Sequence, residues 1–490
     1  MLMSQTPNVL LVILDSARVQ NMGVYGYDRD TTPFLSDFVD SATFYEQARA
    51  PGIHSIASHV SMFTGYHVEE HKAKHHGSEI DVEQTIWKEL AKHHGYTTGL
   101  FTPNHIIATA SNLSDAFDHV KKAEYKKKKY SRDQKLFTDA YGPRDTNIRL
   151  SVSGNFKHAL ADDKPVHSLA NCVWEAINKI EDNIRRTPDH RTTPGDTFID
   201  AFLEWGQKQT EPWAACINLL DTHSPYVPED RFNKWGSESQ LDIQDGKTIS
   251  TGELLSGDRS WDELESLESL YDGTILQADQ YLKQLVNGLR DDCQYDDTLL
   301  IITSDHGEAF GEESNINPEV RLAGHNYGIH EVLTHVPLVV KYPGQQSGES
   351  ISELATLTNI PDTVREVIQD SSSTDQFTKD EYILSSTFRI LRENTTKFPY
   401  INNINKYVGP WRSIYTSQEG ATQKYADHNN TSVVLDVSSP FTQSFINGGS
   451  SINVDKYYEN LSSCDGLREG DTRELNEELE EHLKDLGYIR

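Results

Sequence analysis

Five segments of the chain consist almost entirely of apolar residues. They are residues 8–14, 97–101, 213–219, 298–303 and 336–341. Strands that helices cover on both faces have such continuous apolar runs, whereas strands with one face in water alternate apolar and polar residues. The runs therefore predict the strands of a buried, mostly parallel sheet.

Helical patterns lie between these runs. Residues 85–94 and 197–207 have apolar side chains at helical spacing, and the clearest pattern covers residues 261–289, with Leu264, Tyr271 and Ile275 on one face. Strands that alternate with helices along a chain are typical of an α/β fold, in which helices flank a doubly wound sheet on both sides. We therefore expect this fold class.

The pattern changes after about residue 370. Turn-rich or polar segments at residues 185–196 and 237–260 predict surface loops within the first part. In the last part we expect a small sheet and a charged terminal helix, at residues 382–391, 411–416, 432–437 and 472–486. The chain is thus predicted to have a large α/β domain over residues 1–370 and a smaller C-terminal α+β subdomain over residues 371–490.

Charge and composition exclude several classes of protein. The chain has 75 acidic and 45 basic residues and a formal net charge of −30, which opposes binding to the phosphates of nucleic acids. Such an acidic surface suits high salt, so we interpret the protein as halophilic. The apolar run at residues 9–14 is too short for a signal peptide, no stretch is long enough to cross a bilayer, and the four cysteines are scattered. These features predict a cytoplasmic protein without a membrane span.

Acidic and imidazole side chains follow three of the predicted strands. Asp15 follows the first, Asp221 and His223 follow the run at residues 213–219, and Asp305 and His306 follow the sequence TLLIIT. Ligands of open α/β sheets bind beyond the carboxyl ends of the strands, and Asp with His suits a divalent cation. Taken singly, each Asp is also a common turn former and each His a common structural residue.

A second candidate element is PGIHSIASHVSMFTG, residues 51–65. It is expected to form a loop that enters a short helix, with Ser55 and Ser58 near the helix N-terminus, where free backbone N–H groups favour anions. A hydroxyl in this position can attack a sulfuryl or phosphoryl group. The alternative is an ordinary N-cap serine.

Together the motifs resemble the sulfatase family of the alkaline-phosphatase superfamily. The likeness runs in order along the chain, through NVLLVILDSARVQNMGVYGYDRDTTPFLSDF, GIHSIASHVSMFTG, NLLDTHSPYVP, IITSDHGEAFGE and GHNYGIHEVLTHVPLVVKYPG. The resemblance implies that one divalent metal ion, Ca²⁺ or Mn²⁺, is bound by the side chains of Asp15, Asp305, His306 and Ser55. It also implies that Ser55 is the nucleophile, and that His223 and His325 contact the ester or protonate its leaving oxygen.

The chain departs from the common sulfatase pattern at two places. Ser16 stands where many sulfatases have a second aspartate, and Ser55 and His59 stand where C-x-P-S-R has its cysteine and arginine. Ser55 is therefore expected either to be converted to formylglycine or to act unmodified, as in the phosphoglycerol-transferase-like branch. His59 and His71 are expected to line the substrate pocket, and the imidazole ligand favours manganese over calcium.

Three functions follow from these features. The first is a metal-dependent hydrolase that cleaves a sulfate ester, on a sulfated glycan or a small metabolite, by in-line attack of Ser55. The second keeps the fold and the metal but acts on phosphate esters or phosphodiesters through an unmodified serine. The third is a catalytically silent binding protein that retains the pocket.

Overall fold

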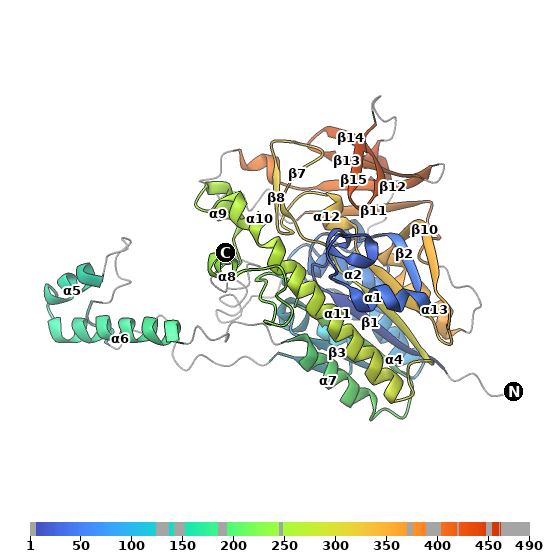
Figure 1. Ribbon diagram of the computed structural model, residues 1–490, viewed down its shortest axis with the longest axis horizontal. Coiled ribbons are helices and arrows are strands. Elements are labelled where there is room, and N and C mark those ends of the chain that lie inside the picture. Colours follow the sequence, from blue (N-terminus) through green and yellow to red (C-terminus); the bar gives the residue numbers. More distant parts are fainter. Residues whose placement is uncertain are drawn as a thin grey trace. The chain divides into compact units, whose positions relative to one another are not determined.

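The computed structural model describes residues 6–123, 137–141, 152–184, 194–244, 248–369, 376–388, 403–418, 421–446, 453–459 and 461. The chain forms two compact units. Met1–Ala123 together with Thr192–Arg490 makes the first, and Glu124–Arg191 makes the second. Figure 1 shows the elements of both units in sequence colours.

An eight-stranded sheet forms the centre of the first unit, with the strand order β10-β2-β9-β6-β1-β5-β3-β4. The inner strands confirm the prediction that the apolar runs form strands: β1 is Asn8–Leu14, β3 is Thr97–Thr102, β5 is Trp213–Leu219 and β6 is Thr298–Thr303. β9, Leu338–Lys341, is also a strand, but it runs antiparallel to both β6 and β2. The sequence did not predict the outer strands β2 (Thr43–Arg49), β4 (His119–Lys122) and β10 (Glu349–Thr356).

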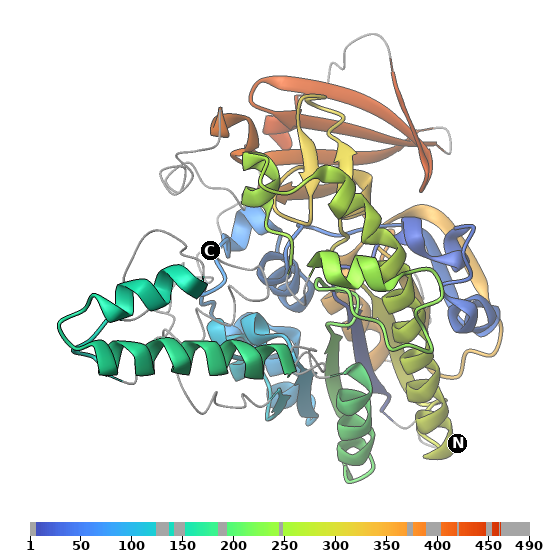
Figure 2. The same ribbon diagram turned by 60° about the vertical axis from the view of Figure 1, so that its left-hand side comes forward.

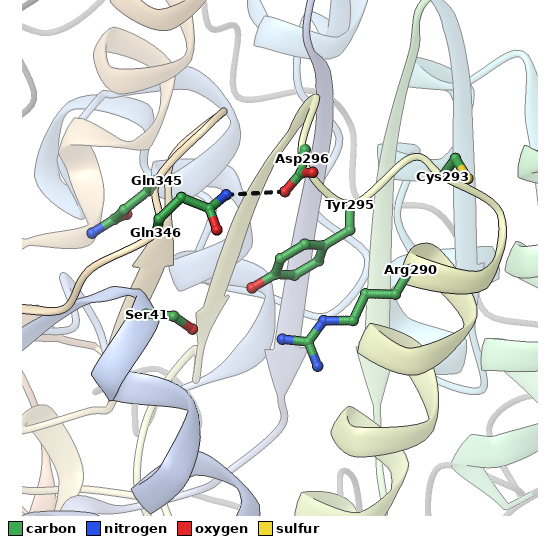
Figure 3. A pocket seen from close by; sticks show the side chains of 7 residues that line it. All are labelled: Ser41, Arg290, Cys293, Tyr295, Asp296, Gln345 and Gln346. Atoms are coloured by element: carbon green, nitrogen blue, oxygen red, sulfur yellow. Dashed lines mark hydrogen bonds between the residues drawn. The ribbon is translucent and has the colours of Figure 1, made fainter.

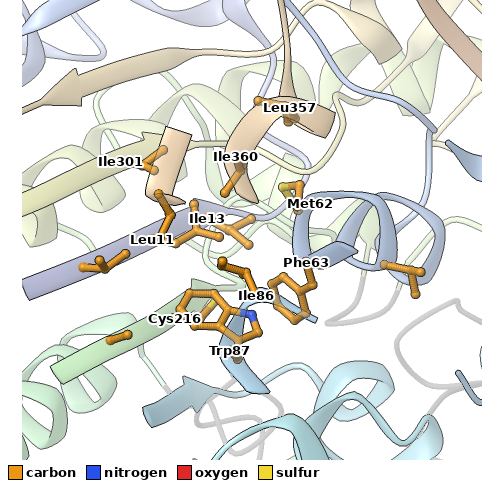
Figure 4. Packing of buried hydrophobic residues seen from close by; sticks show 14 of the residues in the cluster. Leu11, Ile13, Met62, Phe63, Ile86, Trp87, Cys216, Ile301, Leu357 and Ile360 are labelled. Atoms are coloured by element: carbon orange, nitrogen blue, oxygen red, sulfur yellow. The ribbon is translucent and has the colours of Figure 1, made fainter. Parts of the chain in front are cut away.

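Helices cover both faces of this sheet, as the sequence predicts. Alternate residues of β1 point to opposite faces: Leu11 and Ile13 pack into one buried cluster and Leu10 and Val12 into the other. The first cluster includes side chains of α2 (Ser55–Thr64), α4 (Ile86–His93) and α13 (Ile360–Ile368), and Figure 4 shows this packing. The second includes side chains of α1 (Pro33–Phe38), α7 (Gly195–Gly206) and α11 (Glu268–Asp291), and Figure 2 shows α7 and α11 side by side.

Two predicted segments differ from the observed helices. The helix expected over residues 261–289 is divided at Leu267 into α10 (Trp261–Ser266) and α11. The segment expected to be a surface loop, residues 237–260, contains α8 (Glu238–Gln244) and α9 (Thr251–Ser256). Ser250 caps α9 in a reciprocal capping box with Glu253, a local signal that the polar composition hid.

The last part of the chain adds a second, antiparallel sheet in the order β11-β12-β13-β14-β15. Three of its strands correspond to predicted ones, namely β11 (Tyr382–Thr387), β12 (Trp411–Gln418) and β14 (Thr431–Ser439). β13 (Ala421–His428) and β15 (Thr442–Phe445) were not predicted. The sheet begins twelve positions after the predicted domain boundary at residue 370, which itself stays a prediction. The predicted helix at residues 472–486 and most of the predicted loop at 185–196 lie outside the described residues.

The second unit contains the helices α5 (Val152–Leu160) and α6 (Pro165–Ile184). The side-chain amide of Asn171 on α6 donates hydrogen bonds to the backbone carbonyls of Phe137 and Tyr141, so the segment around these two residues is attached to α6. Along the chain, this unit is an insertion between β4 and α7.

Candidate functional site

Asp15, Asp305 and His306 lie together at the carboxyl ends of two adjacent parallel strands. Asp15 follows β1, and Asp305 and His306 follow β6, which pairs with β1 in parallel. One ligand atom from each of the three residues lies within 4.8 Å of the other two, and all three side chains are buried. The structure thus brings together the three side chains that the sequence predicted to share a metal ion.

Ser55 reaches the same cluster from a different element. It is the first residue of α2, and its hydroxyl donates a hydrogen bond of 3.5 Å to Asp15 Oδ2. Ser55 is 2% exposed, so the hydroxyl points into the site rather than into bulk water. The sequence alternative of an ordinary N-cap serine is wrong, because His54 occupies the N-cap position and Ser55 belongs to the first turn.

The two carboxylates oppose each other electrostatically. Burial raises the pKa of Asp305 well above its usual value, and the negative charge of Asp15 raises it further. Asp305 Oδ2 lies 3.4 Å from His306 Nε2, and Asp305 Oδ1 accepts hydrogen bonds from the backbone N–H groups of Ser16 and His306. A divalent cation offsets two buried negative charges, and this set of two carboxylates and one imidazole suits such an ion. The residues present therefore fit the metal that the sequence predicted.

His59 lies one turn after Ser55 and faces the same cluster. Its Nδ1 is 2.8 Å from the backbone oxygen of Ser55 and 3.6 Å from Asp305 Oδ2. Burial lowers the pKa of His59 to about 4, even though the charge of Asp15 acts in the opposite direction. At neutral pH the side chain is therefore an uncharged imidazole, in contrast to the arginine of the common sulfatase pattern.

His325 and His223 extend this cluster through ring contacts. The ring centroids of His306 and His325 are 4.4 Å apart, and those of His325 and His223 are 5.1 Å apart. Both residues are buried, with 6% and 4% of their surfaces exposed. His223 Nδ1 also lies 2.6 Å from the backbone oxygen of Ser224, next to the cis bond to Pro225. The three imidazoles thus form a row that begins at the predicted metal ligands.

Two other candidates lie apart from this row. His71 on α3 (Val68–His71) has Nε2 at 3.0 Å from the hydroxyl of Ser61, and its Nδ1 accepts a hydrogen bond from the backbone N–H of Ala73. These contacts attach α3 to α2, and they do not support the predicted role of His71 in substrate binding. Asp221 turns toward α11, where it accepts a hydrogen bond from Gln277, so it is separate from the three predicted ligands.

Sequence reasoning missed two asparagines that hold Asp15. The side-chain amides of Asn104 and Asn218 donate to Asp15 Oδ2 at 2.9 and 3.4 Å, and Thr102 donates to Asn218 Oδ1. Asn104 comes just after β3, and Asn218 lies in β5. A polar residue inside an apolar strand was the available signal for Asn218, and position after a strand was the signal for Asn104.

A cavity of about 370 Å³ lies at the other end of β6 (Figure 3). Its lining includes Arg290, Tyr295 and Asp296, which precede β6, whereas Asp305 and His306 follow it. None of the predicted site residues lines this cavity. Asp15, Asp305 and His306 lie at the opposite edge of the sheet, after the carboxyl ends of β1 and β6. Within the part of the chain that the structure describes, no helix has the length and apolarity required to cross a membrane.

Comparison with known proteins identifies relatives among the sulfatases. Arylsulfatase K of Gallus gallus is 21% identical over 369 residues, which are 74% of this chain and 63% of that protein. N-acetylgalactosamine-6-O-sulfatase of Bacteroides thetaiotaomicron is 21% identical over 390 residues, which are 70% of this chain and 68% of that protein. The match therefore spans slightly less than two thirds of the length of the Gallus gallus arylsulfatase K.

Solved structures confirm the predicted fold. The phosphonate monoester hydrolase of Agrobacterium radiobacter superposes with a TM-score of 0.58 and 16% identity, over 88% of this chain and 89% of that chain. A protein solved with its substrate D-glucosamine-2-N,6-O-disulfate has a TM-score of 0.55 and 13% identity, over 88% and 91% of the two chains. At these identities the likeness shows the alkaline-phosphatase-like fold alone.

A sequence match that covers most of the first unit and the whole of the insertion shows the family. The model of the family described as Sulfatase matches residues 7–369, a range that contains Asp15, Ser55, Asp305, His306 and His325. The chain therefore belongs to the sulfatase family.

Proposed function

We propose that the protein is a metal-dependent hydrolase that cleaves a sulfate ester by in-line attack of Ser55. The observation that carries this proposal is the position of the Ser55 hydroxyl, 3.5 Å from Asp15 Oδ2 and beside the Asp15–Asp305–His306 cluster. The relatives include an N-acetylgalactosamine-6-O-sulfatase and an N-acetylglucosamine-6-O-sulfatase, whose names support a sulfate ester on a glycan as the substrate. A sulfate ester of a small metabolite is the alternative substrate.

Asp15, Asp305 and His306 would hold one divalent cation, Mn²⁺ or Ca²⁺, together with Ser55. When bound, such an ion withdraws charge from the ester oxygens and lowers the pKa of a hydroxyl that it contacts. The backbone N–H groups of Ser16 and His306 keep Asp305 in place, and the amides of Asn104 and Asn218 do the same for Asp15. These contacts fix the ligand oxygens before a substrate arrives.

The reaction begins at the Ser55 hydroxyl. Its oxygen attacks sulfur and passes its proton to Asp15 Oδ2, which accepts its hydrogen bond, while the bond from sulfur to the leaving oxygen breaks on the opposite side. His325 or His223 gives a proton to the departing oxygen, since both imidazoles lie in the row that extends from His306. In a second step, water attacks the sulfur of the sulfated Ser55, so that sulfate leaves and the serine hydroxyl is restored. If Ser55 is converted to formylglycine, the attacking oxygen belongs to the hydrated aldehyde instead.

The charge of the site favours monoanionic esters. His59, which takes the place of an arginine, is uncharged at neutral pH because burial lowers its pKa to about 4. A sulfate monoester and a phosphodiester each carry one negative charge, whereas a phosphate monoester carries nearly two. The neutral His59 therefore supports a second candidate function, a phosphodiesterase or phosphotransferase with an unmodified Ser55.

The decisive test combines turnover with the mass of the peptide that contains Ser55. Aryl sulfate, aryl phosphate and an aryl phosphodiester are assayed with Mn²⁺ or Ca²⁺, on the wild type and on Ser55→Ala. Ser58→Ala is the matched control, because Ser58 is buried in the same helix and its hydroxyl has no hydrogen-bond partner among the residues that the structure describes. We expect the aryl sulfate to be the preferred substrate and Ser55→Ala alone to abolish its hydrolysis.

Each alternative has its own result. Preference for the phosphodiester, with an unmodified peptide mass, would establish the second candidate. A peptide lighter by two hydrogens would show formylglycine. No turnover of any ester, despite tight binding of the metal ion, would favour a silent binding protein and contradict the proposal.

A further inference from the structure

The small hairpin β7 (Phe310–Glu313) and β8 (Arg321–Ala323) places an acidic residue against one of the site imidazoles. Phe310 pairs with Ala323 in this hairpin. At the adjacent position, the Ala309 N–H donates to the Gly324 oxygen at 3.1 Å and the Gly324 N–H donates to the Ala309 oxygen at 2.9 Å. The next two residues along the chains, Glu308 and His325, are thereby brought face to face. Glu308 Oε2 lies 3.3 Å from His325 Nδ1, and both side chains are buried.

From this geometry we propose that Glu308 is a positioning residue for His325, an inference that rests on the proposed function. A carboxylate that accepts a hydrogen bond from Nδ1–H fixes the tautomer of an imidazole and leaves Nε2 available for proton transfer. Glu308 thus orients His325 as the group that protonates the leaving oxygen. His223 Nδ1 lies against the backbone oxygen of Ser224.

The surroundings of Glu308 hold it in place. Arg18 donates from Nη1 to the backbone oxygen of Glu308 at 3.0 Å. Burial raises the pKa of the Tyr226 hydroxyl, and the charge and hydrogen bonding of Glu308 raise it further. Tyr226 is itself buried against the rings of Tyr271 and Phe310. The carboxylate therefore has a fixed position from which to orient the imidazole.

Gly324 makes the close approach of the carboxylate possible. It has φ +58°, and a Cβ atom on this residue would lie 3.1 Å from Glu308 Oε1. A side chain at position 324 would thus be strained by the backbone and would press on the carboxylate. The contact between Glu308 and His325 therefore explains why residue 324 is glycine.

The test compares esters whose leaving groups differ in acidity, from nitrophenyl through phenyl to alkyl. Wild type, Glu308→Gln and Glu308→Asp are measured, because the amide keeps the shape of Glu308 and the shorter acid keeps its charge. In Glu308→Gln we expect kcat to fall about 100-fold or more for the alkyl ester and only a few-fold for the nitrophenyl ester, with little change in KM, because an acidic phenol needs no proton donor. Glu308→Asp should recover part of the loss.

Glu313→Gln is the matched control, because Glu313 belongs to the same hairpin and its side chain is exposed. It should change the dependence on leaving group by less than two-fold. An equal fall of kcat for every leaving group in Glu308→Gln would overturn the inference and indicate a merely structural role.

A second readout does not depend on turnover. The ¹⁵N signals of His325, assigned by comparison with His325→Gln, report which ring nitrogen carries the proton. We expect Nδ1 to keep its proton in the wild type, so that Nε2 is the nitrogen that takes up and releases the transferred proton, and we expect this preference to be weakened in Glu308→Gln. An unchanged tautomer would overturn the inference. If the proposed function is wrong, the wild type itself will show no turnover, and this result is distinct from a failure of the inference about Glu308.

Discussion

Lys424 Nζ lies 2.9 Å from Glu331 Oε1, although one residue belongs to the C-terminal sheet and the other to α12 (Glu331–Thr334). Both side chains are almost fully buried. Arg49 of β2 lies 2.9 Å from the other carboxylate oxygen, and Tyr415 of β12 donates a hydrogen bond to Oε1. One carboxylate therefore joins the eight-stranded sheet to the five-stranded sheet. Burial opposes its ionisation, but the charges of Arg49 and Lys424 outweigh this effect and lower its pKa.

Replacing Lys424 with Met should destabilise the fold strongly. Removal of one partner from a buried ion pair typically costs about 3–5 kcal/mol, because the remaining charge stays in a low-dielectric environment. Urea unfolding measures the loss. The exposed pair Glu204–Lys208 is the control, and Glu204→Gln should have no measurable effect on stability. Equal effects of the two changes would show that the buried pair does not join the sheets.

The metal-free protein should lose stability as pH rises, and Asp305→Asn should remove part of this loss. Burial and the charge of Asp15 raise the pKa of Asp305, so the folded state binds this proton more tightly than the unfolded state. Stability from this group is therefore greatest below the unfolded pKa of about 3.9 and falls as pH rises toward the folded value. Thermal unfolding in EDTA at pH 5 and pH 8 measures the difference.

The same variant should respond less to added metal. For the wild type, Mn²⁺ at 100 times its Kd should add about 2.7 kcal/mol of stability, and Asp305→Asn should show little of this gain. Asp296→Asn, at the opposite end of β6, is the control and should respond as the wild type does. A full response of Asp305→Asn to Mn²⁺ would exclude Asp305 from the ligand set.

Asn104→Ala should weaken metal binding without removing a ligand. The Asn104 amide donates at 2.9 Å to Asp15 Oδ2 and so orients that carboxylate. Loss of such an outer contact typically reduces metal affinity by about 10–100-fold. Isothermal titration with Mn²⁺ measures the change, and Asn317→Ala, in the turn before β8, should leave the affinity unaltered. An unchanged affinity in Asn104→Ala would mean that Asp15 keeps its position without the amide.

Asp221→Asn should make the fold less sensitive to pH. Burial raises the pKa of Asp221 to about 6, and within the described part of the chain its Oδ2 has no hydrogen-bond partner. Folded Asp221 therefore holds its proton more tightly than unfolded Asp221, and the wild type loses stability between about pH 4 and pH 6. Relative to the wild type, the variant should gain on the order of 1 kcal/mol on going from pH 4 to pH 8, after allowance for solvent screening.

Urea unfolding across this range tests the prediction, and Asp200→Asn on the outer surface of α7 provides the control. Asp221→Asn retains the oxygen that accepts from Gln277, so its folded structure should be preserved. The same pH dependence in wild type and variant would assign the effect to another group.

The apolar runs predicted the inner strands well because their two faces are both buried. Residues such as Leu10 and Leu11 give a continuous pattern, and the position just after such a strand is where Asp15 and Asp305 were found. The outer strand β2 escaped prediction because it alternates buried and partly exposed residues, including Glu46. β13 escaped because its buried Lys424 looks like a surface residue until its partner Glu331 is known.

Pairings across the fold were likewise beyond the sequence. Glu308 lies in the motif IITSDHGEAFGE, but its partner His325 became evident only through the hairpin that aligns the two residues. Asn104 and Asn218 are residue types that usually indicate turns, and only the arrangement of β3 and β5 beside β1 brings both amides to Asp15. The roles of these residues could therefore be assigned only from their neighbours in the folded structure, and not from the local sequence pattern.

The central place of β1 has a consequence for synthesis on the ribosome. Its two neighbours are residues 214–219 and 298–303, so β1 leaves the ribosome long before either partner strand has been translated. Pairings this distant are slow to form, and an unpaired apolar strand invites association with other chains. The nascent polypeptide should consequently depend on chaperones until β6 has left the exit tunnel.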